Sequence, residues 1–230
     1  CRFISFIALT FSFTIIALCQ DAALLAPNQP VEKTLSGGET HSYRVAASAG
    51  QYFRITVEQR NLDVTIKITS PGAKSPVEID LTRKGAVAET AAQIAEIAGD
   101  YRIEVSTAKT TPRGNYQILL ADLRSPTEQD RQRSAAQKNF LDADTLYSEN
   151  SPGSRRKAIE KYDEALQLWR TLGERSLQAL ALYNIGDTYR VLNDYPKSLD
   201  LLNQALQIRR ELSQREEEAT VLNSIGAAYS

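Results

Sequence analysis

The chain has 230 residues, of which 42% are hydrophobic and 24% are charged, and its formal net charge is -1. This composition is that of a folded protein with one large or two ordinary domains. Because the parts before and after Arg124 are each nearly neutral, bulk charge excludes general electrostatic attraction to nucleic acid or to an anionic membrane, and we expect neither as a partner.

The first 19 residues have the pattern of a secretory signal peptide. Phe3 to Leu18 are apolar apart from Ser and Thr, and they follow a single Arg2. This run is shorter than the roughly 20 residues that a membrane span needs. The small residues Ala17 and Cys19 favour cleavage after Cys19. We therefore expect an exported protein, periplasmic or secreted, with no membrane attachment after cleavage; a retained anchor is the alternative.

The sequence contains no methionine, so we expect the signal peptide to lack its first residues. Both cysteines, Cys1 and Cys19, lie in the signal, and cleavage would leave a mature chain with no thiol and no disulfide. The chain stops at Tyr229 and Ser230 inside a helical pattern, and we expect further repeats to have followed.

Apolar and polar residues alternate from Thr40 to Leu120, which is typical of half-buried strands. The apolar positions of the clearest runs are Phe53, Ile55 and Val57; Val64, Ile66 and Ile68; Val77, Ile79 and Leu81; Tyr101, Ile103 and Val105; and Tyr116, Ile118 and Leu120. Turn residues such as Gly37-Gly38, Ser70-Pro71-Gly72 and Gly99-Asp100 separate these runs. The pattern predicts an antiparallel β-sandwich over residues 31–123.

The same region resembles the bacterial pre-peptidase C-terminal domain. The resemblance rests on strands that open with Gly-x-Tyr, namely Gly50-Gln51-Tyr52, Gly99-Asp100-Tyr101 and Gly114-Asn115-Tyr116. It implies a small jelly-roll module that serves secreted proteins in targeting or binding and has no catalysis of its own. Carbohydrate or cell-surface binding by these tyrosines is a weaker hypothesis, because tyrosines at strand starts usually pack inside.

Beyond Ser125-Pro126 the period becomes that of a helix. Ala136, Phe140, Ala143 and Tyr147 are spaced so that they share one helix face. This spacing predicts a connector helix over residues 126–149, and the residues at 150–154 are expected to break it.

After this break the sequence repeats itself at a distance of 40 residues. The matching pairs are Leu182 and Leu222, Ile185 and Ile225, Gly186 and Gly226, Tyr189 and Tyr229, Lys157 and Lys197, Ala165 and Ala205, Leu166 and Leu206, and Arg170 and Arg210. The period predicts an α-helical solenoid of stacked hairpins over residues 154–230, with the last repeat incomplete.

The segment Leu182-x-x-Ile185-Gly186-x-x-Tyr189 resembles the tetratricopeptide signature. Ser198, Leu202 and Ala205 match the small, large and small positions of its second helix. The usual unit has about 34 residues, and the longer period here is similar to that of kinesin-light-chain repeats. Leu146 stands 40 residues before Gly186, so the first hairpin lacks the signature glycine and is expected to cap the array.

No combination of nucleophile, base and orienting group can be assembled, so we expect no enzyme activity and no cofactor from this chain. His41 is the single histidine and is interpreted as structural, which leaves no metal site. Asp63 is interpreted as a loop-capping acid, with a cation contact as the alternative.

The candidate site is a peptide groove along the first helix of each repeat, where the resemblance places Tyr183, Asp187 and Arg190.

These patterns predict a multidomain β + α chain, an antiparallel β-sandwich of jelly-roll type followed by a tetratricopeptide solenoid. The predicted function is an interaction scaffold that binds partner proteins or peptides. The order of export signal, sandwich and repeats also resembles the N-terminal half of bacterial proteins that end in a caspase-like (CHAT) peptidase domain. The alternative function is therefore the regulatory and targeting half of such a cysteine peptidase, with its catalytic domain beyond residue 230.

Overall fold

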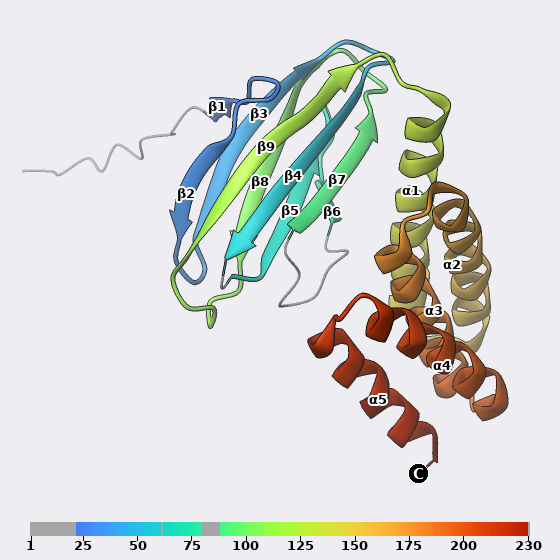
Figure 1. Ribbon diagram of the computed structural model, residues 1–230. Coiled ribbons are helices and arrows are strands. Elements are labelled where there is room, and N and C mark those ends of the chain that lie inside the picture. The colour runs from blue at the N-terminus through green and yellow to red at the C-terminus, as the bar shows by residue number, and fades with distance from the viewer. Residues whose placement is uncertain (1–21, 61, 80–87, 230) are drawn as a thin grey trace, which may run out of the picture.

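The computed structural model describes residues 22–60, 62–79 and 88–229, and it consists of a two-layer β-sandwich followed by five helices (Figure 1). The expected signal peptide, residues 1–19, lies outside the described residues, as does the predicted strand position Leu81.

One layer of the sandwich is a five-stranded sheet and the other is a four-stranded sheet. The first has the order β1 (Ala23–Leu24), β3 (Thr40–Ala47), β8 (Gly99–Thr107), β5 (Val64–Thr69) and β6 (Val77–Ile79). The second has the order β2 (Val31–Leu35), β9 (Gly114–Arg124), β4 (Tyr52–Arg60) and β7 (Ala88–Ile94). All pairings are antiparallel except that of the short β1 with β3.

The alternating runs of the sequence form strands β4, β5, β6, β8 and β9, which confirms the predicted sandwich. The turn before β8 lies at residues 95–98, so Gly99 and Asp100, which were expected in a turn, already belong to the strand. Strand β7 was not anticipated, because its sequence AETAAQI contains one β-branched residue before its last position and no aromatic residue.

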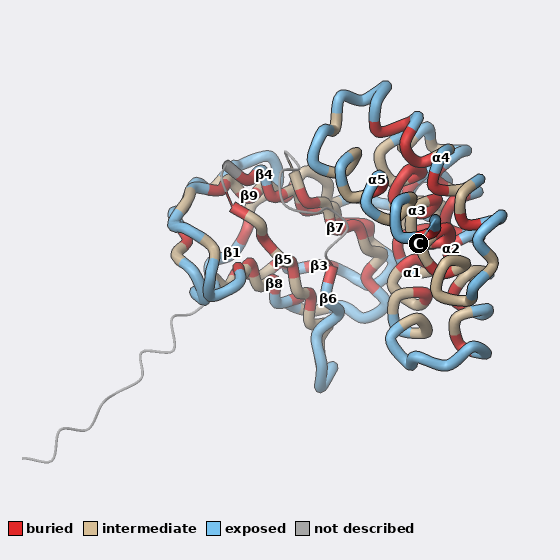
Figure 2. The backbone as a smooth tube through the Cα atoms, turned by 90° about the horizontal axis from the view of Figure 1, so that it is seen from below, coloured by how far each residue is buried: buried red, intermediate tan, exposed pale blue. Residues whose placement is uncertain are grey.

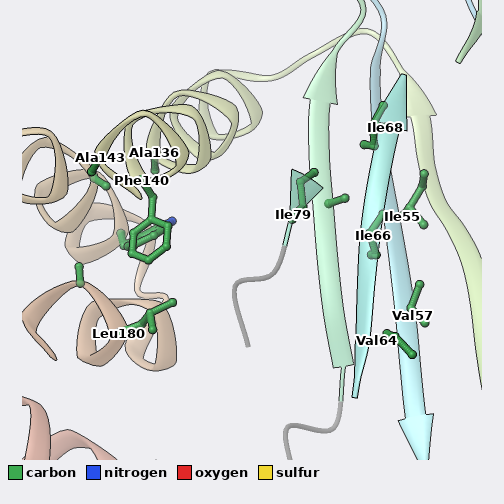
Figure 3. Packing of buried hydrophobic residues seen from close by; sticks show 14 of the residues in the cluster. Ile55, Val57, Val64, Ile66, Ile68, Ile79, Ala136, Phe140, Ala143 and Leu180 are labelled. Carbon is green, nitrogen blue, oxygen red and sulfur yellow. The ribbon is translucent and has the colours of Figure 1, made fainter. Parts of the chain in front are cut away.

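The sandwich core consists of the inward-facing residues of both sheets. Ile55 and Val57 of β4 point toward Val64, Ile66 and Ile68 of β5 (Figure 3), and all five are at most 1% exposed. Tyr101 and Tyr116 belong to this core, which agrees with their expected inward packing. Tyr52 is buried too, but on the opposite face of β4 from Ile55 and Val57, where the guanidinium of Arg124 lies over its ring.

The helical region consists of α1 (Glu128–Ser148), α2 (Pro152–Leu172), α3 (Arg175–Val191), α4 (Tyr195–Glu211) and α5 (Arg215–Tyr229). Each of the four turns between them contains one residue with positive φ, and these residues are Asn150, Gly173, Asn193 and Ser213. The predicted break separates α1, which ends at Ser148, from α2. Pro152 begins α2, where a missing N–H is tolerated, and Ser151 caps that helix through the N–H of Ser154. The side chain of Asp194 caps α4 by accepting a hydrogen bond from the N–H of Lys197.

Consecutive helices pack as antiparallel hairpins, and α1 pairs with α2 through a cluster of aromatic rings. The ring centroid of Phe140 lies 5.1 Å from that of Tyr162 and 5.2 Å from that of Trp169. The expected connector helix is therefore the first helix of the first hairpin. Helices α1, α3 and α5 form the layer nearer the sandwich, and α2 and α4 form the outer layer (Figures 1 and 2).

Candidate functional site

Helix α3 is held in place by a close approach to α4 that Gly186 makes possible. A Cβ built on Gly186 would lie 3.0 Å from Cγ of Leu202 and 3.2 Å from the carbonyl oxygen of Ser198. Ser198, Leu202 and Ala205 are all fully buried, as the small, large and small pattern predicts. This packing of one face of α3 leaves Tyr183, Asp187 and Arg190 on another face, toward α1 and α5.

Asp187 and Arg190 are joined by a two-point ion pair. The Nε of Arg190 donates a hydrogen bond to Oδ1 of Asp187 at 2.9 Å, and its Nη2 lies 2.8 Å from the same oxygen. The hydroxyl of Tyr147, on α1, donates to Oδ2 of the same carboxylate at 3.3 Å. Burial first, and the nearby charge of Asp187 second, raise the pKa of Tyr147. The predicted acid and base thus form one polar cluster with a tyrosine of the neighbouring hairpin.

Tyr183 connects α3 to α5, because its hydroxyl accepts a hydrogen bond from Oγ of Ser224 at 3.3 Å. The three predicted groove residues therefore lie on one face of α3, but they also bridge the inner-layer helices. Sequence reasoning assigned neither Tyr147 nor Ser224 to the groove. The sequence placed Tyr147 only on the apolar face of its helix. Ser224 lies 40 residues after Asn184, and because these two residues differ, no repeated polar residue marked this position.

The first hairpin replaces the glycine contact by a hydrogen bond. Phe140, Ala143 and Tyr147 occupy the places that Leu182, Ile185 and Tyr189 have in α3, a spacing of 42 rather than 40 residues. In that register Asp144, and not Leu146, corresponds to Gly186. The hydroxyl of Tyr162 donates to Oδ1 of Asp144 at 2.5 Å. Asp144 is partly buried, and the burial of Tyr162 together with the charge of Asp144 raises the pKa of Tyr162.

The two residues considered for metal binding, His41 and Asp63, each make a hydrogen bond within the sandwich. Nδ1 of His41 lies 2.7 Å from the hydroxyl of Tyr116, which is itself 2.5 Å from that of Tyr43. The carbonyl oxygen of Asp63 accepts a hydrogen bond from Thr107 at 2.7 Å. In the part of the chain that the structure describes, no group of three or more His, Cys, Asp or Glu side chains is arranged to hold a metal ion.

The sandwich is joined to the helices by an ion pair between Arg124, whose side chain is exposed, and Asp130, which is buried at the start of α1. Arg124, the last residue of β9, donates from Nη1 at 2.5 Å and from Nη2 at 3.2 Å to the carboxylate of Asp130. The backbone N–H and the hydroxyl of Thr127 donate to the same carboxylate. Burial opposes the ionisation of Asp130, but these hydrogen bonds outweigh it and hold its pKa well below the usual range.

Two further contacts fix the orientation of α1 against sheet and hairpin. The N–H of Ala92, on β7, donates to Oε1 of Gln137 at 3.0 Å. Arg133 donates to Glu174, in the turn between α2 and α3, at 2.8 Å. A cavity of about 210 Å³ lies between this part of the helices and strands β4 and β7. Among the described residues, no helix is long and apolar enough to cross a membrane.

A family model of the tetratricopeptide repeat matches the chain twice, over residues 153–211 and 177–230. These two matches cover helices α2 to α5 and include the glycine contact described above. The helical region carries tetratricopeptide repeats. No curated protein matches the chain.

The chain is also similar to solved structures of β-domains. One is the pre-peptidase C-terminal domain of collagenase from Bacillus anthracis, with 16% sequence identity over 43% of this chain and 93% of that chain, and a TM-score of 0.37. Another is PliG of Salmonella Typhimurium, a periplasmic lysozyme inhibitor of g-type lysozyme, with 15% identity over 42% of this chain and 93% of that chain, and a TM-score of 0.31.

Proposed function

We propose that this chain is the interaction scaffold of an exported protein, and that the inner layer of α1, α3 and α5 binds a partner protein or peptide. Tetratricopeptide repeats indicate a role in protein–protein interaction. The observation that supports this particular surface is the gathering of Tyr183, Asp187 and Arg190 on one face of α3. No catalytic step is assigned to the chain.

The chemistry of this face suits a partner that offers both polar and aromatic contacts. The side chains of Asp187 and Arg190 are 18% and 29% exposed, so both are held in place by each other and still reach solvent. The residues of α5 that stand 40 positions after Tyr183 and Asp187 in the sequence are Asn223 and Ala227, and both are exposed. Ordered charges lose little conformational freedom on binding, which favours recognition over non-specific adhesion.

A photo-crosslinking experiment tests the surface. A benzophenone amino acid at position 183 of the intact chain is expected to crosslink a discrete partner in cells, because the side chain lies on the proposed binding face. The control carries the same amino acid at Asn203, which is exposed on the outer helix α4. Equal crosslinking from the two positions would contradict the assignment of the inner layer.

Export is a separate part of the proposal and rests on the sequence of residues 1–19. We expect residues 1–30, preceded by a start codon and fused to alkaline phosphatase, to give enzyme activity in bacteria, since that enzyme is active only after translocation. Leu9→Arg in the same fusion interrupts the apolar run and should abolish the activity. Activity that survives this substitution, or that is absent from the unmodified fusion, would argue against the signal.

A further inference from the structure

Strand β7 is the outermost strand of its sheet, and helix α1 lies beside it (Figures 1 and 2). In an antiparallel strand, the backbone N–H and C=O groups of successive residues point to opposite sides. Just past β7, Ala95 exchanges backbone hydrogen bonds with Gly50 and Gln51, beside the start of β4. Odd-numbered residues therefore face β4, and the backbone groups of Thr90 and Ala92 face the opposite side.

Gln137 of α1 takes the place of a neighbouring strand at one point of this edge. Its Oε1 accepts the outward N–H of Ala92 at 3.0 Å, and its side chain is held in the interface, with the residue 6% exposed. Thr90 is the next residue with outward backbone groups, about 7 Å further along the edge. Among the described residues, no strand pairs with this side of β7 and no hydrogen bond joins Thr90 to α1.

The open part of the edge borders the cavity between the sandwich and the helices. Thr90 and Ala88 line it from β7, Arg54 lines it from β4, and Leu177 lines it from α3. The two side chains of β7 that line the cavity, those of Ala88 and Thr90, are small. The cavity therefore lies where the outward edge of β7, an apolar side chain and a guanidinium come together.

Of the two arginines that line the cavity, Arg54 and Arg133, we consider Arg54 the one with hydrogen-bond donors available to a ligand. Arg54 donates to Asp122 through Nε at 2.7 Å, and its terminal nitrogens have no hydrogen-bond partner among the described residues. Its side chain is 37% exposed. Arg133 is engaged by Glu174 at 2.8 Å and lies 3.8 Å from Asp130. A carboxylate entering the cavity would thus find the two free nitrogens of Arg54, which suit two-point recognition.

We propose that the edge of β7 takes up an extended peptide segment of a partner protein as an additional strand, with a carboxylate of that peptide on Arg54. An extended backbone is the ligand that repeats donors and acceptors at the spacing of the edge. The hydrogen bond of Gln137 to Ala92 marks where the added strand would end against α1. This surface is separate from Tyr183, Asp187 and Arg190, so it is a second binding site beyond the proposed function.

A peptide selection with matched variants tests the proposal. Randomised eight-residue peptides with free C-termini are displayed and selected against the intact chain, Thr90→Val and Thr90→Pro. Proline removes the outward N–H but leaves the pairing with β4 in place, and proline is tolerated at such edge positions. We expect selected peptides to bind the unmodified chain and Thr90→Val alike, and Thr90→Pro at least tenfold more weakly. Arg54→Gln should weaken peptides with acidic residues about tenfold.

Hydrogen exchange supplies a second readout that does not depend on the folding of the proline variant. A selected peptide should slow exchange of the Thr90 amide in the unmodified chain at least tenfold, because that N–H becomes hydrogen-bonded. The proposal is overturned if no peptide is enriched, if Thr90→Pro binds as well as Thr90→Val, or if the Thr90 amide is unaffected. Peptides weakened by Tyr183→Ala instead would use the inner helical layer, which would support the proposed function and overturn this site.

Discussion

At the scale of single residues, Gly186 shows most directly how sequence determines packing. Its missing side chain lets α4 approach until Cγ of Leu202 is 3.0 Å from where a Cβ would lie. The equivalent position in α5, Gly226, differs because a Cβ there would have no heavy atom within 4 Å. The same residue type, 40 positions apart, therefore carries a packing constraint in one helix and none in the other.

Gly186→Val should destabilise the helical region by about 1–3 kcal/mol, since the added carbons overpack against Leu202. Gly226→Val is the matched control and should cause no loss, because valine has a higher helix propensity than glycine. Urea unfolding followed by helical circular dichroism measures both changes. If the two variants lose equal stability, the close approach of α3 and α4 does not matter energetically.

Asp130 gives the junction a dependence on pH. Its folded-state pKa is lowered, whereas the unfolded value is about 4. A lowered pKa means that the stabilisation is fully present above about pH 4 and is lost as the pH falls through the folded-state value.

We expect Asp130→Asn to be less stable than the unmodified chain at pH 7 by about 1–2 kcal/mol, a figure reduced for the solvent exposure of Arg124. The difference should shrink below about pH 4, because the unfolded chain then binds a proton at this carboxyl group, and folding has to release it. Asp142→Asn removes an exposed pair with Lys138 and serves as the control, with little change at either pH. A difference that stayed constant down to pH 2 would exclude the ion pair as its cause.

The candidate site was predictable from sequence only as far as its own helix. The signature around Gly186 fixes which face of α3 carries Tyr183, Asp187 and Arg190, because helical periodicity determines faces. Their hydrogen bonds to Tyr147 and Ser224 depend on how neighbouring hairpins stack. Neither contact has a local sequence signal, since each joins residues about one repeat apart.

At the scale of elements, strands with alternating β-branched or aromatic residues were predictable and strand β7 was not. The sequence AETAAQI alternates only weakly, and its position is set by the ladder it forms with β4. The first hairpin was misaligned for a related reason. Two extra residues separate α1 from the matched part of α2, so the fixed distance of 40 residues pointed to Leu146 instead of Asp144.

Helix α5 leaves part of its apolar side exposed to solvent. Leu222 is 43% exposed and Tyr229 is 76% exposed, whereas Leu182, the equivalent of Leu222 in α3, is 2% exposed. Because local opening follows the amount of buried apolar contact, amides of α5 should exchange with solvent at least tenfold faster than those of α3. Hydrogen exchange with mass spectrometry resolves the two helices, and equal protection would contradict this expectation.

At the scale of the whole molecule, the sandwich takes the place of a preceding hairpin against α1. Tyr52 and Ala92 of the second sheet are buried on the side that faces the helices, and Ala136 of α1 is fully buried. A tetratricopeptide hairpin cannot bury its outer faces alone and needs a neighbour. The sequence predicted a capping role for the first hairpin but gave no sign of this sheet contact, because Gln137 and Ala92 are 45 residues apart.

If the sandwich acts as this neighbour, sandwich and helices should unfold together. Calorimetry of the intact chain is expected to show one transition, and Gln137→Ala should separate it into two, because the buried N–H of Ala92 loses its acceptor at a cost of about 1–3 kcal/mol. Lys138→Ala, one residue further and exposed, is the control and should retain the single transition. Two transitions in the unmodified chain would mean that the contacts at β7 orient the two parts without coupling their stability.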